Sequence, residues 1–388
     1  MRTTANPEVI AWALERAGKT PEELKSVSSR VQEWIDGKGK PPTRKQLEKL
    51  AKATHVLLPY FYADSLPDLA LQIPDYRTLD SERPSNPSPE LYDVVNQMLS
   101  RQDWLADYLG DDDGEELAFV GCCAGMADAN ACAAIMRRLL QLNLGWARGM
   151  RADEAVRCLR GAIERAGVYV CAGSYFGNST RRAFKVEEFR GFVLADKVAP
   201  IIFLNTADVK SAQLFTLAHE FAHLLFNESG VDDVGFANHD RADEDLCDSV
   251  AAEFLVPAAL VHELFDESDH DHALDELRRL TCTSTVVCLR RALDLGRMSK
   301  SEFFDRYMSY KNQMAEVGQR PSAGAGGPTF YAMVKNHLGS LFTDTVYSAL
   351  KSDRLLYADA YKLTGMSAKS FSEYFRREGM YVRAAPRR

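Results

Sequence analysis

Residues 217–226 read LAHEFAHLLF, and the fold and function expected for the chain follow mainly from this stretch. Two residues four apart on a helix lie about 40° from each other, so His219 and His223 present their rings from one face. Two neutral imidazoles in this arrangement can ligate one metal ion. Glu220 is offset by one residue and can reach a water molecule on that metal without being a ligand. The pattern therefore predicts a catalytic metal site on a helix over residues 208–226.

The side chains around these three polar residues favour a metal site over a chance match. Nearly every other residue from Phe215 to Phe226 is apolar, which predicts a buried helix. Two imidazoles and a carboxylate buried without partners would cost several kcal/mol. A bound metal ion removes that cost, and the ligand types indicate Zn²⁺.

A third ligand is expected downstream, because a catalytic zinc ion takes three protein ligands and keeps a fourth position open. Residues 244–257 read EDLCDSVAAEFLVP and predict a helix from about 242 to 256. Glu244 is the predicted third ligand. Asp248 lies four residues later on the same face and is expected to accept a hydrogen bond from the outer nitrogen of a ligand histidine.

Three other residues compete for the place of the third ligand. His239 stands in an expected loop, and Asp243 could replace Glu244 if the helix register differed. Glu253 lies about 180° around the helix from Glu244, so both cannot face the metal. Glu253 is therefore expected to point to solvent.

Short β-branched runs upstream of the metal site predict one small sheet. They are GVYVCA at 167–172, RGFVLAD at 190–196 and APIIFLN at 199–205, each bounded by turn residues. The second or the third run is expected to offer its edge to an extended substrate. Helical patterns fill most of the remaining chain, so the expected fold class is α+β and mainly helical, with a small sheet and the metal-binding helix at its core.

Proline- and glycine-rich stretches divide the chain into expected units. The expected units are a helix-turn-helix-like module at 1–65, a proline-rich linker at 66–90, a metal-binding domain at 91–318, and a helical C-terminal extension at 319–388 that begins with the joint PSAGAGGP at 321–328.

The composition is typical of a globular protein that stays in the cytoplasm. The 388 residues contain no apolar run long enough to span a bilayer, and the charged start of the chain lacks the apolar core of a secretory signal. The eight cysteines form no C-x-x-C pair and are expected to be reduced and mostly buried. No membrane partner is expected, and an oligomer is compatible with the sequence.

Any affinity for DNA is expected at the N-terminus. The net charge of −8 argues against binding by the whole chain, but residues 1–60 hold 11 Lys and Arg against 7 Asp and Glu. Short helices separated by small turns suit a helix-turn-helix, and a helix is expected to start at Thr20. Arg30 and Gln32 are the candidate base-reading residues. A module kept for packing or dimerisation is the alternative.

The two ligand-bearing stretches resemble the ImmA/IrrE family of metallopeptidases. LFTLAHEFAHLLF followed by EDLCDSVAAEFLVPAAL is similar to the family pattern of H-E-x-x-H and then E-x-x-x-[ND]-x-x-A-A-x-x-L-x-P. This resemblance implies a zincin-like core and a zinc peptidase of the thermolysin ligand type. Glu244 then stands at the third-ligand position and Asp248 at the Asn/Asp position.

Other segments resemble the longer members of that family. WIDGKGKPPTRKQLEKLAKA and IPDYR are similar to their N-terminal XRE-type helix-turn-helix, although the segment from Glu23 to Trp34 is several residues shorter here. This difference removes part of the turn that joins the second helix to the recognition helix. GGPTFYAMVKNHLG resembles their C-terminal extension.

The expected function is that of a zinc-dependent, site-specific endopeptidase with Glu220 as general base. The resemblance implies a protein partner, a repressor or antitoxin-like protein encoded nearby, in stress response, control of phage or mobile elements, or a toxin–antitoxin module. His262, Tyr175 or His239 is expected to stabilise the oxyanion. The alternatives are a DNA-binding transcriptional regulator or a partner-sequestering protein, either with a structural or dormant zinc site.

Overall fold

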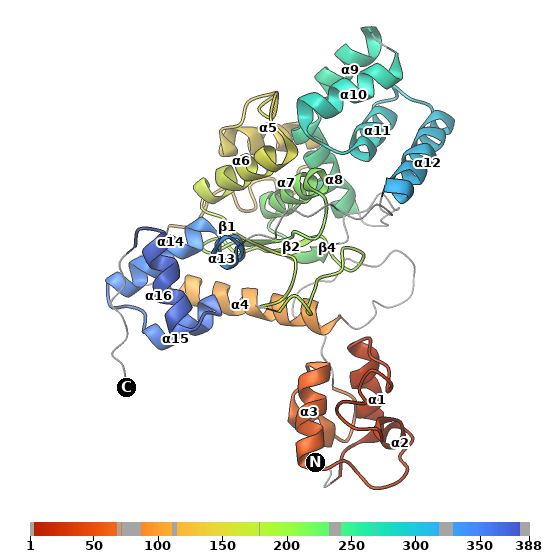
Figure 1. Ribbon diagram of the computed structural model, residues 1–388. Helices are drawn as coiled ribbons and strands as arrows, with labels where there is room; N and C mark the ends of the chain where they lie inside the picture. The colour runs from red at the N-terminus through yellow and green to blue at the C-terminus, as the bar shows by residue number, and fades with distance from the viewer. Residues whose placement is uncertain are drawn as a thin grey trace.

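The structure is a computed structural model that describes residues 4–67, 71, 87–110, 115–177, 179–232, 242–267, 269–317 and 329–380. This part of the chain is mainly helical and contains a four-stranded sheet (Figure 1), which confirms the expected α+β class. The expected joint at 321–328, the IPDYR segment at 73–77 and His239 lie outside the described residues. No helix in the described ranges is long and apolar enough to cross a membrane.

The sheet has the strand order β1-β3-β2-β4. Its strands are β1 (Tyr169–Gly173), β2 (Gly191–Leu194), β3 (Ile201–Asn205) and β4 (Gly230–Asp232). β1 runs parallel to β3, whereas β2 is antiparallel to both β3 and β4. The prediction that β2 or β3 offers a free edge is therefore wrong, because each is paired on both sides and the outer strands are β1 and β4.

Helices cover both faces of the sheet, because alternate strand residues point to opposite sides and nearly all residues of β1, β2 and β3 are apolar or small. Val170, Val193 and Ile202 face a core formed with the helices on one side. These helices are α5 (Ala129–Leu140), α6 (Ala152–Arg165), α7 (Lys210–Phe226) and α8 (Ala242–Leu255). Four further helices follow along the chain: α9 (Ala258–Glu267), α10 (His270–Thr281), α11 (Thr285–Asp294) and α12 (Lys300–Val317).

The opposite face of the sheet is covered by α4 (Pro89–Gly110) together with the C-terminal helices (Figure 1). These are α13 (Phe330–Leu338), α14 (Ser340–Lys351), α15 (Tyr357–Thr364) and α16 (Ala368–Arg377). Arg101 of α4 donates to the carbonyls of His337 and Leu363, near the C-terminal ends of α13 and α15. The partial negative charge at these helix ends stabilises the buried guanidinium. The C-terminal helices thus lie on the face of the sheet opposite to α7, and they do not cover α7.

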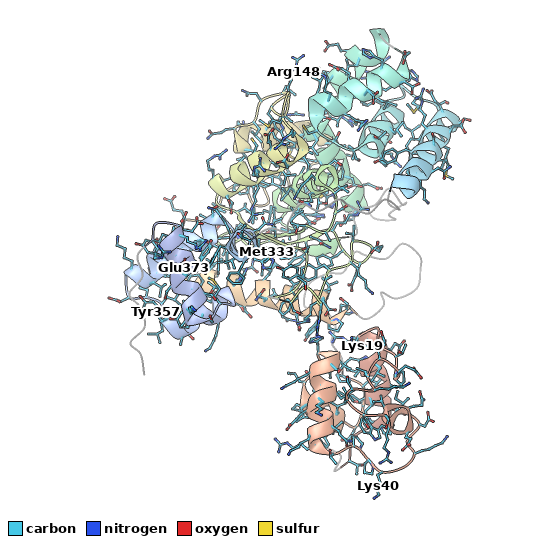
Figure 2. All side chains as sticks on the ribbon, viewed as in Figure 1. Lys19, Lys40, Arg148, Met333, Tyr357 and Glu373 are labelled. Carbon is cyan, nitrogen blue, oxygen red and sulfur yellow. The ribbon has the colours of Figure 1, made fainter. Side chains whose placement is uncertain are left out.

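The N-terminal helices α1 (Pro7–Arg16), α2 (Val31–Ile35), α3 (Arg44–Thr54) and the 3-10 helix η1 (Leu58–Tyr62) enclose a core of their own. The prediction of a helix starting at Thr20 is wrong. Glu23 accepts a hydrogen bond from the Thr20 amide at 2.7 Å, as at a helix start. Most of the next backbone hydrogen bonds, however, join residues only three apart, and residues 21–27 form turns. Figure 2 shows Lys40 at the end of this unit that is remote from the sheet.

Candidate metal centre

Helix α7 is held rigidly between the sheet and its neighbouring helices. All residues from Gln213 to Leu225 are buried. The helix ends at Asn227, which adopts the left-handed conformation with φ 62°. Two carbonyls of its last turn accept hydrogen bonds from a preceding loop, where the amides of Gly121 and Cys123 donate to Leu224 and Leu225 at 2.9 and 2.8 Å. The polar side chains of α7 therefore project from a fixed support.

Three ligand-type atoms converge beside this helix. The Nε2 atoms of His219 and His223 lie 3.0 Å apart. Oε2 of Glu244, from α8, lies 3.4 Å from His219 Nε2 and 3.5 Å from His223 Nε2. All three residues are at most 5% exposed. The structure thus brings together the three residues that the sequence singled out, and they form a buried group able to hold a metal ion.

The size of this triangle matches the donor set of a zinc site. A tetrahedral zinc ion with bonds of about 2.0–2.2 Å to nitrogen and carboxylate oxygen separates its ligand atoms by about 3.3–3.6 Å. The observed separations of 3.0 to 3.5 Å need only small adjustments to reach that arrangement. Two imidazoles and one carboxylate also leave the fourth position that a catalytic site requires.

The outer nitrogens of both histidines face acceptors. Asp248 Oδ1 lies 2.9 Å from His219 Nδ1, on the helix face expected from its spacing to Glu244. Glu228 Oε2 lies 3.4 Å from His223 Nδ1. Partners of this kind fix the ring orientation and the tautomer of a ligand histidine. Sequence reasoning missed Glu228, although a carboxylate five residues after the second histidine was a signal that could have been followed.

Cys247 also lies beside the second histidine. Its Sγ atom is 3.5 Å from His223 Nδ1, so His223, Glu228 and Cys247 form a second group of ligand types. Burial raises the pKa of the Cys247 thiol, and a protonated thiol is a poor metal ligand. This second group lies on the Nδ1 side of His223, whereas the Nε2 atom of the same ring belongs to the triangle.

Glu253 does not point to solvent, and that prediction is wrong. It is 8% exposed and pairs with Arg291 of α11, while its Oε1 atom lies 3.6 Å from Nη2 of Arg137 in α5. Its Oε2 atom accepts a hydrogen bond from the Ala258 amide at the start of α9. The carboxylate thus joins α8 to three other helices on the side away from the metal ligands.

The remaining candidates of the sequence analysis lie elsewhere in the structure. The hydroxyl of Tyr175 donates a hydrogen bond to Sδ of Met333 at 2.6 Å. Met333 belongs to α13, which lies across the sheet from α7 (Figure 2). His262 belongs to α9, and its Nδ1 atom accepts a hydrogen bond from Nε of Arg297 at 2.6 Å. Neither residue belongs to the group of convergent ligand atoms, and a role of His262 in stabilising the oxyanion stays a prediction. His239 and the side chain of Asp243 lie outside the described residues.

The two candidate DNA-reading residues sit at the short helix α2. Arg30 forms an ion pair with Glu33 at 2.8 Å, and Gln32 donates to Asp36 at 2.8 Å. These local contacts occupy side chains that base reading would need to release. DNA binding through residues 1–65 stays a prediction.

Comparison with known proteins bears on the part of the chain that holds the triangle. Residues 163–293 match the Peptidase M78 family model, the IrrE N-terminal-like domain. This match supports the ImmA/IrrE family. The IrrE-like domain covers about a third of the chain and runs from the end of α6 through the sheet and α7 to α11.

A second family model matches part of the C-terminal helices. Residues 338–377, in the C-terminal helices, match a family described as a domain of unknown function, DUF8813. No curated protein matches the chain. The IrrE-like domain supports a peptidase, and neither of these two matches reaches the N-terminal helices.

Proposed function

We propose that the chain is a zinc-dependent endopeptidase in which His219, His223 and Glu244 hold the metal ion and Glu220 is the general base. The observation that carries this proposal is the convergence of three buried ligand atoms beside Glu220, inside a segment that matches a peptidase family. A zinc ion held there supplies a Lewis acid that polarises the scissile carbonyl and lowers the pKa of water.

The chain's own residues then carry the proton transfers. The carboxylate of Glu220, which is fully buried, accepts the proton of the attacking water and later passes it to the leaving amine. Asp248 and Glu228 keep the histidine rings oriented through their Nδ1 atoms. Strand β4 begins three residues after Asn227 and is an outer strand of the sheet formed by the described residues, so its outer edge can pair with an extended substrate segment.

The substrate we propose is one specific protein partner, a repressor or antitoxin-like protein encoded nearby. We do not expect the enzyme to cleave proteins without selectivity. About two thirds of the chain lies outside the IrrE-like domain, far more than hydrolysis itself requires. Contacts between such remote parts and a partner can supply binding energy that positions one scissile bond.

The test is to incubate the zinc-loaded full chain with the product of the neighbouring gene and with casein, and to follow fragments by mass spectrometry. We expect selective cleavage of the partner by the wild type, none by the Glu220→Gln variant, and little cleavage of casein. A stable, intact complex with both forms would favour a partner-sequestering protein. Tight, sequence-specific DNA binding at physiological salt without cleavage would favour a regulator with a dormant zinc site.

A further inference from the structure

The strand that lies under the proposed general base begins with a glycine. We infer that Gly191 is a positioning residue for Glu220. Because Gly191 has no side chain, the Glu220 carboxylate can occupy the space next to the backbone of β2. This inference rests on the proposed function and adds to it a residue outside the ligand-bearing helices. Gly191 faces α7, on the same side of β2 as Val193.

The distances at this position leave no room for a methyl group. A Cβ atom on Gly191 would lie 2.7 Å from Oε1 of Glu220 and 2.6 Å from Cγ2 of Thr216. The carbonyl oxygen of Phe203 would be 3.1 Å away. Two of these separations are shorter than any ordinary van der Waals contact, so a substitution must displace a neighbour.

The strand itself cannot move away easily. Gly191 is paired with Leu204 of β3 on one side and with Asp232 of β4 on the other. Its backbone has no left-handed φ, so the cost of a side chain comes from space and not from backbone strain. The backbone of β2 therefore lies next to the Glu220 carboxylate and is held in place by its pairing with β3 and β4.

Of the two side chains that a methyl group would meet, Glu220 is the one that can move farther. The overlap with Thr216 adds a similar cost in every Glu220 background and so cancels when two backgrounds are compared. Thr216 is β-branched, has few rotamers on a helix and is 1% exposed. The Glu220 carboxylate ends a longer side chain with more rotatable bonds. An added methyl group at position 191 is therefore expected to push this carboxylate from its place, and a shift of about 1 Å at a reacting group costs about 100-fold in rate.

The first test compares turnover of the zinc-loaded full chain on the partner substrate. Gly191→Ala is expected to lower kcat by about 100-fold with KM and zinc content little changed. In a Glu220→Asp background the carboxylate is one methylene shorter, so Gly191→Ala is expected to cost much less. Equal losses of kcat in both backgrounds would overturn the inference, because they would show an effect that bypasses Glu220.

Gly173→Ala is the matched control for this experiment. Gly173 ends β1, and a Cβ atom there would lie 2.8 Å from Nε2 of His337 on the other face of the sheet. This variant carries the same glycine-to-alanine change with a comparable overlap. It is expected to lower the unfolding temperature while leaving kcat within about twofold of the wild type.

The second test does not depend on activity or on metal. In the metal-free chain, Gly191→Ala is expected to lower the unfolding temperature by several degrees, and by clearly less in a Glu220→Ala background. An equal drop in both backgrounds would show that the methyl group does not meet Glu220, and the inference would fail. If the wild type cleaves nothing, the proposed function is wrong. The difference in unfolding temperature between the two backgrounds would still show whether a methyl group at position 191 contacts Glu220.

Discussion

Replacing Glu220 by glutamine is expected to lower the turnover of the partner substrate by about 10²–10⁴-fold, the contribution typical of a positioned general base. The amide keeps the shape of the side chain but cannot accept the proton of the attacking water. Zinc content is expected to stay at the wild-type level, because Glu220 is not one of the three convergent ligand residues. Turnover and bound zinc are measured on the same preparations.

Glu228→Gln separates loss of the base from loss of charge near the metal. Glu228 lies beside His223 Nδ1 and holds a ligand in orientation, so its replacement is expected to weaken zinc binding by about 10- to 100-fold. At saturating zinc its turnover should remain near that of the wild type. A Glu220→Gln chain with undiminished turnover would remove Glu220 from the mechanism.

Removing the charge of Glu253 is expected to destabilise the fold by about 3–5 kcal/mol, the cost of breaking a buried ion pair from one side. Glu253→Gln would leave two largely buried guanidinium groups, those of Arg137 and Arg291, without their carboxylate. Burial already lowers the pKa of both arginines, and Glu253 opposes that effect. Chemical denaturation followed by circular dichroism measures the loss.

Glu263→Gln is the control for this change, because Glu263 is an exposed residue of α9. It is expected to alter stability by less than about 0.5 kcal/mol. Equal stabilities of the two variants would mean that the contacts of Glu253 with α5 and α11 contribute nothing to the fold.

The sequence indicated correctly which side chains lie together at the candidate metal centre, because this geometry depends on one helix at a time. The spacing of His219 and His223, and that of Glu244 and Asp248, fixes which side chains share a face. The first three strands were also predicted within about two residues, since each is an apolar run bounded by turn residues. β4 was missed because its three residues, Gly230–Asp232, carry no apolar pattern.

Features that depend on packing between distant segments could not be predicted in this way. The helical angle showed that Glu253 turns away from Glu244, but not that Arg137 and Arg291 are brought to it from α5 and α11. Likewise, Thr20 and Glu23 form the contact of a helix start, yet the hydrogen bonds that follow join mostly residues three apart and the chain continues as turns. The space at Gly191 exists only once α7 lies on β2.

The zinc content of purified full-length chains, measured by elemental analysis, tests the central claim most directly. We expect about one zinc ion per chain in the wild type and in Glu220→Gln, and little in His219→Ala, His223→Ala or Glu244→Ala. The reason is that only the last three changes remove an atom of the convergent triangle. Full zinc content in Glu244→Ala, or none in the wild type under zinc-replete conditions, would contradict the site as described.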